Sequence, residues 1–147
     1  MPTFPKSNPM KSKAKRLRKK AVKVTDPRKG LIKKADALWS KIIRSQPGPC
    51  EYCGKWHKVY QAHHIFSRGR WNVRYVLMNG IKLGQGCHRR IHQEASMAFA
   101  EWVMEKLGDK YTRLKLLSQG HFKKTVSNLQ MIYDQLKQID EQLNKGE

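Results

Sequence analysis

The chain has 147 residues, of which 31 are Lys or Arg and 11 are Asp or Glu, so its formal net charge is +20. This charge favours a nucleic-acid partner, because a polyanion releases its counterions on binding, although a basic protein that is merely soluble or that packs chromatin or ribosomes is the alternative. Three closely spaced cysteines argue against a disulfide framework, and no apolar run is long enough for a signal peptide or a membrane span, so we expect a soluble cytoplasmic protein with no membrane partner.

The first segment, residues 1–28, is predicted to be a disordered basic arm. It combines prolines and closely spaced Lys and Arg with few large apolar side chains, so it cannot bury enough surface to offset the entropy of ordering. Two interpretations stay open for it: an arm that follows a phosphate backbone, or a solubilising tail.

A helix is expected next, with Asp26 as its N-cap and Pro27 at its first position. The Pro-Gly-Pro sequence of residues 47–49 should end it. Apolar side chains recur on one face at helical spacing, as in a helix that packs on a core: Leu31, Ala35, Leu38 and Ile42, widened by Ile32, Trp39 and Ile43.

Five of the six histidines lie in one central segment, and such clustering is typical of a metal site. His88 and His92 would share one face of a helix, within reach of one ion. Val59–Ile65 is predicted to be a strand, so its adjacent histidines, His63 and His64, would point to opposite faces. One of the two could complete a three-histidine metal site, while the other faced the far side of a bound phosphate.

This division of roles suits hydrolysis of a phosphodiester bond. In-line displacement needs the attacking water and the leaving oxygen on opposite sides of phosphorus. A neutral imidazole suits the base, and a metal ion suits stabilisation of the leaving oxygen. Asn79 lies in a second apolar stretch with Ile81 and Leu83, predicted to be the return strand of a hairpin. Its amide could tie the hairpin together and hold the base histidine in place.

The order His63-His64, Asn79, His88, His92 resembles the HNH motif of the ββα-metal nucleases, in the colicin-type DNase version with two adjacent histidines. The resemblance implies that His63, His88 and His92 bind one catalytic divalent ion, that His64 is the general base, and that Asn79 is the structural member of the catalytic motif. It also implies DNA cleavage to 5′-phosphate and 3′-hydroxyl ends. Mg, Mn, Ni and Zn are all candidates for the ion, although three imidazoles suit Zn, Ni or Mn better than Mg.

The Cys50-x-x-Cys53 pair resembles the zinc knuckle of many HNH proteins, which carry a second such pair directly before the catalytic helix. Here that second pair lacks its first cysteine, because Gly84 stands in its place ahead of Cys87. His57 could supply the missing ligand, since structural zinc sites accept three thiolates and one imidazole. Two interpretations stay open: a structural zinc on Cys50, Cys53, His57 and Cys87, or three reduced cysteines without a metal.

Arginines and aromatic residues are interleaved in residues 67–75, between the two halves of the motif. Such a segment suits phosphate contacts combined with stacking or groove insertion, and the alternative is a solvated basic loop around a buried Trp71. No set of residues offers a base-reading code. The arginines predicted to contact DNA are Arg68, Arg70, Arg74, Arg89 and Arg90.

The rest of the chain is predicted to be helical. One helix should run from about Gly86 to a stop at Gly108, and a short helix should cover Lys110–Ser118. The first of these would bury an apolar face formed by Ile91, Ala95, Ala98, Phe99, Trp102 and Val103.

The last helix, predicted over Lys124–Asn144, has apolar residues at the a and d spacing of a coiled coil. The pattern is short for a free-standing coil, so two interpretations stay open: the helix folds back on its own domain, or it forms a homodimer. The positions concerned are Leu129, Ile132, Leu136, Ile139 and Leu143.

Together these features predict an α+β, mostly helical fold. Its centre would be a ββα-metal (HNH) hairpin-plus-helix core with a zinc-knuckle-like cysteine cluster, flanked by helices and by the disordered basic arm. The expected domains are the arm at 1–28, an HNH nuclease domain with flanking helices at 29–120, and a C-terminal amphipathic helix at 121–147.

The expected function is a metal-dependent HNH endonuclease that hydrolyses DNA. The layout of the later helices is similar to that of phage HNH proteins of the NinG recombination-nuclease kind. That similarity implies a phage or prophage origin, the cytoplasm of a bacterial or phage-infected cell, and a role in DNA recombination, repair or packaging. The alternatives are a catalytically inactive zinc-knuckle DNA-binding module and a dimeric scaffold built on the last helix.

Overall fold

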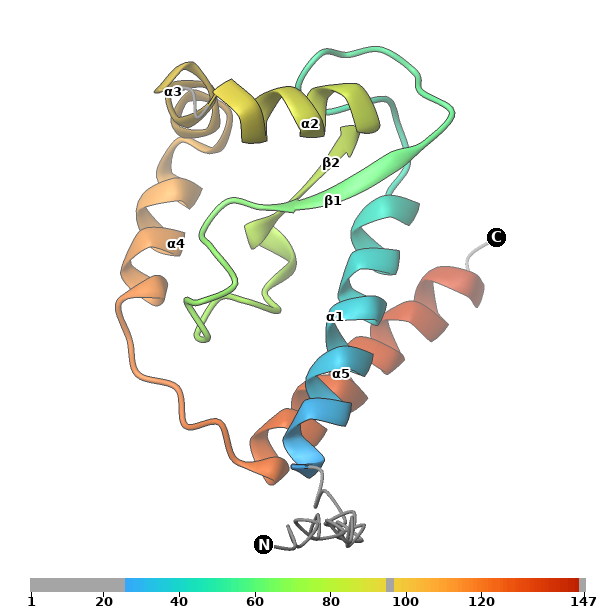
Figure 1. Cartoon of the computed structure of the whole chain (residues 1–147), viewed down its shortest axis with the longest axis vertical. Coiled ribbons are helices and arrows are strands. Elements are labelled where there is room, and N and C mark those ends of the chain that lie inside the picture. The colour runs from blue at the N-terminus through green and yellow to red at the C-terminus, as the bar shows by residue number, and fades with distance from the viewer. Residues whose placement is uncertain (1–25, 95–96, 146–147) are drawn as a thin grey trace, which may run out of the picture.

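The computed structural model describes residues 26–94 and 97–145, so nearly all of the predicted basic arm lies outside the described residues. Within them the chain is mostly helical, with one small antiparallel sheet, as the sequence predicts (Figure 1). The elements are α1 (Pro27–Ser45), β1 (Tyr60–His64), the 3-10 turn η1 (Leu77–Asn79), β2 (Gly80–Gly84), α2 (Gln85–Glu94), α3 (Met97–Leu107), α4 (Asp109–Ser118) and α5 (Val126–Lys145).

Helix α1 begins where its cap predicts, because Asp26 Oδ1 accepts a hydrogen bond from Arg28 N at 3.0 Å and Pro27 occupies the first turn. Pro27 and Arg28, which the predicted arm also included, belong to this helix. The helix ends at Ser45, directly before the Pro-Gly-Pro turn. Its buried side chains are Ala35, Trp39, Ile42 and Ile43.

The two strands form an antiparallel hairpin in which His63 pairs with Ile81 and His64 with Gly80. Asn79 was predicted within the return strand but ends η1, one residue before β2. A Cβ atom at Gly80 would lie 2.8 Å from Trp39 Cζ2, and closer still to the side chain of Ile43. Glycine at this position therefore lets α1 pack directly against the sheet.

The predicted single helix from Gly86 to Gly108 is two helices, α2 and α3, which run in different directions (Figure 1). Ala98, predicted on the buried face, is exposed, and Ala95 lies outside the described residues. The apolar spacing continues across the junction without Gly or Pro, so local periodicity could not reveal the break. Gly108 ends α3 with φ +50°, as predicted, and α4 covers the predicted short helix.

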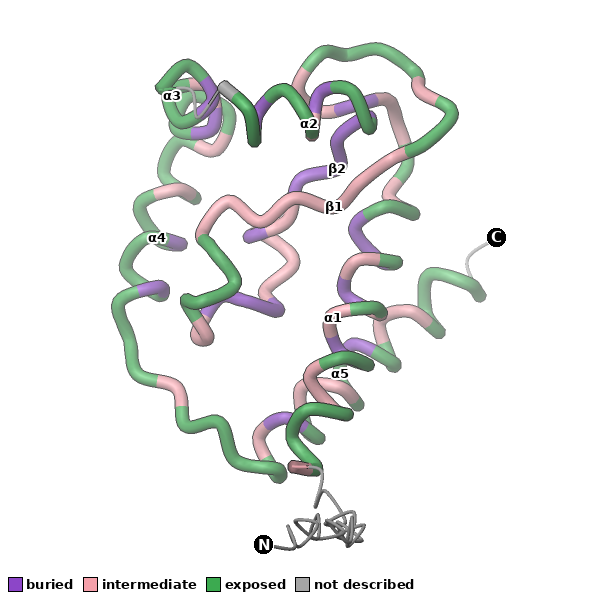
Figure 2. The backbone as a smooth tube through the Cα atoms, in the orientation of Figure 1, coloured by how far each residue is buried: buried purple, intermediate pink, exposed green. Residues whose placement is uncertain are grey.

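Most of the buried apolar residues fall into two clusters. Figure 2 shows buried positions along α1, β2 and α5. The first joins the sheet to α2 and α3 through Leu83, Ile91 and Val103. The second joins α1 to α5, with Leu136 packed in the cluster around Trp39. The catalytic candidates on β1 therefore lie between two separately packed sets of helices.

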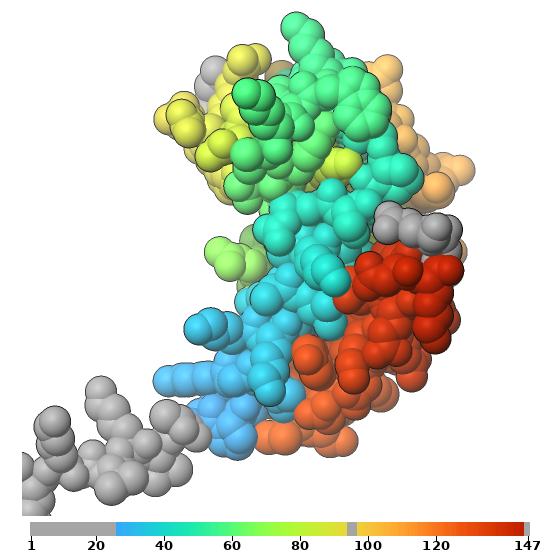
Figure 3. Space-filling view, turned by 90° about the vertical axis from the view of Figure 1, so that its right-hand side faces the viewer, coloured from blue at the N-terminus to red at the C-terminus, as the bar shows by residue number. Residues whose placement is uncertain are grey.

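Helix α5 lies along α1, so the prediction that it folds back on its own chain is confirmed (Figure 3). Leu129 and Leu136 are buried, and Lys41 Nζ donates to Asp140 Oδ2 at 2.7 Å. Leu143 is 48% exposed. The homodimer stays an untested prediction. Among the described residues, every helix is too short or too polar to cross a bilayer.

Candidate functional site

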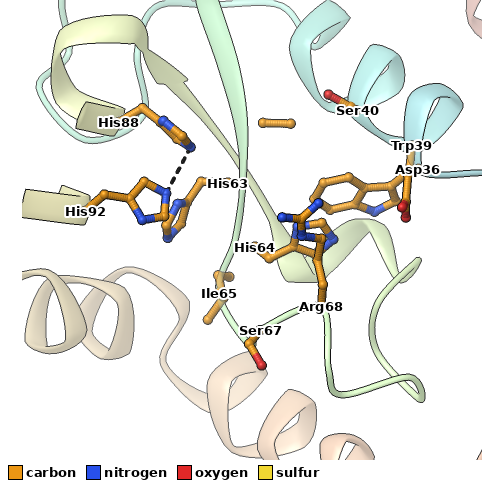
Figure 4. Close-up of a pocket in the computed structure, with 11 residues that line it drawn as sticks. Asp36, Trp39, Ser40, His63, His64, Ile65, Ser67, Arg68, His88 and His92 are labelled. Carbon is orange, nitrogen blue, oxygen red and sulfur yellow. Dashed lines mark hydrogen bonds between the residues drawn. The ribbon is translucent and has the colours of Figure 1, made fainter. Parts of the chain in front are cut away.

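Three imidazoles meet between the hairpin and the helix that follows it. His63 comes from β1, and His88 and His92 come from successive turns of α2. One nitrogen of each ring lies within 4.8 Å of a nitrogen of each of the others, and the Nε2 atoms of His88 and His92 are 3.3 Å apart (Figure 4). The three residues predicted as metal ligands are thus brought together in a geometry that could hold one cation.

The surroundings of His63 and His88 favour neutral rings. Burial, followed by the neighbouring His92, His88 and His64, lowers the pKa of His63 to about 4. Burial and then His92 also lower the pKa of His88 below its ordinary value. At neutral pH these rings therefore keep a lone pair available for a cation, because protonation would place like charges side by side in a partly buried site.

His64 points to the other side of β1, where Trp39 of α1 supports its ring (Figure 4). The two ring centroids are 3.8 Å apart, and the planes are inclined by 14°. His64 Nε2 lies 2.9 Å from the carbonyl oxygen of Arg74. A carbonyl can only accept, so Nε2 carries the hydrogen and Nδ1 keeps the lone pair that a general base needs.

Burial lowers the pKa of His64, and this effect outweighs the hydrogen bond to the Arg74 carbonyl, which raises it. The positive charges of Arg74 and Arg68 lower the pKa further, whereas the carboxylate of Asp36 raises it. The ring is thus unprotonated at neutral pH, as a base must be before it takes a proton.

Arg74, also predicted to contact DNA, is buried, and each nitrogen of its guanidinium donates to a group within the protein. Its Nε and Nη2 donate to the two carboxylate oxygens of Asp36 at 2.9 and 2.6 Å. Its Nη1 donates to the carbonyl oxygen of Arg68 at 2.8 Å. A guanidinium fork matched to a carboxylate in this way fixes the loop between the strands instead of binding a phosphate.

The histidines on both faces of β1 open into one cavity of about 450 Å³. His63, His88 and His92 line one part of it, and His64 lines another (Figure 4). The remaining lining includes polar groups from α1 and the loop: Asp36, Ser40, Ser67 and Arg68. A ligand in this cavity can therefore contact the triad and His64 at the same time.

Asn79 is completely buried and ties the loop between the strands to the sheet. Its Oδ1 accepts from Phe66 N at 2.7 Å, and its Nδ2 donates to the carbonyl oxygens of Phe66 at 3.1 Å and Val73 at 2.9 Å. The predicted tying role is confirmed by these bonds. The link to His64 is indirect, since the carbonyl that holds His64 belongs to Arg74, directly after Val73.

The second cluster consists of Cys50, Cys53, His57 and Cys87, whose ligand atoms also lie within 4.8 Å of one another. The Cys53 Sγ to His57 Nε2 distance is 3.3 Å, and all three cysteines are free thiols. Cys50 and Cys87 are buried, whereas Cys53 is exposed. Three sulfurs and one imidazole at this spacing could bind a metal such as zinc.

The structure gives Gly84 a specific reason to be glycine. A Cβ atom at this position would lie 2.6 Å from His57 Nε2 and would overlap the rest of the ring. The imidazole of His57 therefore fills the space that a side chain at position 84 would need. A cysteine at position 84 and the His57 imidazole in its present position therefore cannot both fit.

The two buried thiols of this cluster, Cys50 and Cys87, differ in how readily they ionise. Burial, reinforced by the neighbouring Cys53 and Cys50, raises the pKa of Cys87 to about 12. Burial opposes ionisation of Cys50 as well, but backbone N–H groups, that of Gly84 first, bring its pKa below the ordinary value. A bound cation would offset the repulsion between thiolates, since a coordinating thiol loses its proton.

The other arginines predicted to contact DNA are exposed: Arg68, Arg70, Arg89 and Arg90. Arg89 also borders a shallow hollow beside His88 and His92. Their contact with DNA stays a prediction.

Sequence reasoning missed the supporting roles of Asp36 and Trp39. Trp39 carries the apolar spacing of a core residue, and Asp36 is a polar residue on the same helix, so neither offers a local signal.

Comparisons with known proteins give no match to a family model, to a curated protein or to a solved structure. The function must therefore be inferred from the site's own geometry.

Proposed function

We propose that this protein is a metal-dependent endonuclease of the HNH kind that hydrolyses DNA phosphodiester bonds. One observation carries the proposal: His63, His88 and His92 converge, while His64 on the opposite face of the same strand opens into the same cavity. A hairpin followed directly by a helix that bears two of the histidines also agrees with a ββα-metal core.

The donor set fits a divalent ion. His63, His88 and His92 would hold it, and three neutral imidazoles favour Zn, Ni or Mn over Mg. When bound, such an ion supplies stabilisation of the negative charge that develops on the leaving 3′ oxygen.

His64 would act as the general base. Its Nδ1 would take the proton from the attacking water, while the Nε2–H bond to the Arg74 carbonyl keeps the ring in the required tautomer. The stack on Trp39 fixes the plane of the ring. The lowered pKa of His64 keeps Nδ1 unprotonated at neutral pH before each turnover.

DNA binding would come from charge more than from base contacts. The exposed Arg68 stands at the cavity and Arg89 beside the histidines of α2, where each could reach a phosphate. The net charge of +20 adds a long-range attraction that falls with salt. We further propose a role in phage or prophage DNA recombination, repair or packaging in the bacterial cytoplasm.

A structural zinc on Cys50, Cys53, His57 and Cys87 would support the catalytic helix. Cys87 immediately precedes His88 in α2, so a metal bound at the cysteines would fix the first turn of the helix that carries two catalytic ligands.

Plasmid cleavage tests the proposal. The purified protein is incubated with supercoiled plasmid and Mg, Mn, Ni or Zn, next to a His64→Ala variant purified in the same way. We expect nicked or linear product from the parent protein, and loss of cleavage with retained DNA binding in the variant. Equal cleavage by both proteins would show a contaminating nuclease or a different base, and would refute the assignment of His64.

The cysteine cluster supports one other candidate, a zinc-knuckle DNA-binding module without catalysis. The same experiment separates the two functions. Tight DNA binding with no cleavage under any of the four metals would favour the module.

A further inference from the structure

A second cavity, of about 260 Å³, lies where the loop between the strands meets the linker between α4 and α5. Arg70, Trp71 and Asn72 line it from the loop, and Phe122 lines it from the linker. A Cβ atom at Gly120 would lie 2.5 Å from Asn72 Nδ2, so glycine allows the linker to approach the loop closely. The volume is just below the range of drug-sized sites, which suits a single small flat group.

Two aromatic rings border this cavity in an arrangement suited to stacking. The rings of Trp71 and Phe122 are inclined by only 10°, and their centroids are 6.4 Å apart. Both side chains are only half-buried. Because both rings line the cavity and are only half-buried, part of their surface is available to another flat π system.

The charge around the two rings is positive. Lys124 Nζ lies 4.9 Å from the Trp71 ring centroid, and Arg70, which lines the cavity, is exposed. None of the residues that line this cavity is acidic. Proteins that bind single strands combine aromatic rings, which stack on bases, with positively charged side chains, which hold the phosphates.

The same loop connects this cavity to the proposed catalytic site. Arg68 lines the main cavity, and Arg70 and Trp71 line the second. The guanidinium of Arg74 lies 4.6 Å from the Trp71 ring centroid, while the carbonyl oxygen of Arg74 accepts from His64. A single strand that follows this loop could therefore place a phosphate at the histidines and one of its bases at the aromatic pair.

We infer that Trp71 and Phe122 form a stacking site for an unpaired base of single-stranded DNA, beside the site of cleavage. The inference rests on the proposed function for its substrate, and it narrows that substrate to DNA with an unpaired segment. Strand binding itself requires no hydrolysis, so the two proposals can fail separately.

Fluorescence anisotropy tests the inference on the full chain carrying His64→Ala, so that no strand is cut. The probes are a labelled oligothymidylate and a labelled duplex of equal length. Adding Phe122→Leu or Trp71→Leu should weaken single-strand binding about tenfold, because an apolar side chain without a π face cannot stack. Duplex binding should stay unchanged. Trp56→Leu is the matched control, since Trp56 is 75% exposed and outside the cavity, and it should leave both affinities unchanged.

Equal single-strand affinity in the Phe122→Leu and parent proteins would overturn the inference, as would an equal loss for single strand and duplex.

Photocrosslinking provides a readout that needs no variant. An oligonucleotide containing 5-iodouracil should crosslink to the peptides that contain Trp71 or Phe122, and crosslinks confined to other peptides would also overturn it. If the parent protein cleaves plasmid but the Trp71 and Phe122 variants keep full single-strand affinity, only this inference is refuted. If these variants lose single-strand affinity but the parent protein cleaves no plasmid, only the proposed function is refuted.

Discussion

The two candidate metal clusters lie side by side, since Cys87 of one precedes His88 of the other in the chain, yet they differ in openness. The cysteine cluster offers four ligands, two of them buried, and His57 fills the space beside Gly84. The histidine cluster offers three ligands and borders a cavity. Closed four-ligand sites are typical of structural metals, and three-ligand sites with an open position are typical of catalytic ones. One short helix, α2, thus carries residues of both candidate sites: Cys87 in its first turn, and His88 and His92 along its length.

Removing a ligand from the open cluster should have the largest effect on activity. We expect His88→Ala to reduce cleavage by more than about a hundredfold. Mutating even a residue that only hydrogen-bonds to a metal ligand lowers metal affinity or activity about 10- to 100-fold. Thermal unfolding should change little, because His88 is only half-buried. Plasmid cleavage and calorimetry on the same sample measure both. A large fall in the unfolding temperature would contradict the division between the clusters.

Removing a ligand from the closed cluster should mainly affect stability. Cys87→Ala should release the zinc and lower the unfolding temperature by at least about 10 °C, because the binding energy of a structural zinc is folding energy. Metal analysis of the purified protein and a melting curve with and without chelator check this. An unchanged melting curve would mean that the cluster holds no structural metal.

The close fit of His57 against Gly84 can be tested with one variant that disrupts it and a double variant that restores four metal ligands. Gly84→Ala should destabilise the protein by about 1–3 kcal/mol, because the added methyl overlaps the His57 ring. The double variant Gly84→Cys with His57→Gly exchanges the ligand positions and should regain zinc and stability, since four thiolates also bind zinc. Denaturant unfolding and zinc content measure both variants. If the double variant is less stable than Gly84→Ala, His57 has a role beyond ligation.

The smallest effect concerns the support of His64. Asp36→Asn removes the negative charge that raises the pKa of His64, so this pKa should fall further. Because the base works only when unprotonated, the acid limb of the cleavage pH profile should move to lower pH. Activity at neutral pH should drop by about tenfold as the Arg74 loop loses its anchor. Asp134→Asn, at the surface of α5, is the matched control. An unshifted acid limb would leave Asp36 with a purely structural role.

Features set by neighbours in the sequence were predictable here. The cap at Asp26, the opposite faces of His63 and His64, and the shared helix face of His88 and His92 all depend on short spacings. Distant partners were not predictable. Arg74 was predicted to contact DNA because no local pattern reveals its carboxylate partner, Asp36, which lies 38 positions away in the chain.

The break between α2 and α3 and the fit of His57 against Gly84 have the same origin. The break carries no Gly or Pro signal, and only tertiary packing distinguishes two helices from one continuous apolar face. The steric exclusion at Gly84 exists only once β2 and the segment before β1 are folded together. In both places the deciding contact is made between residues that no local pattern connects.

Anomalous diffraction from crystals grown with Mn tests the central claim most directly. We expect one peak about 2.0–2.3 Å from a ring nitrogen of each of His63, His88 and His92, with His64 outside the coordination sphere. No peak at these three rings, or a peak that includes His64 as a ligand, would contradict the proposed division between metal site and base.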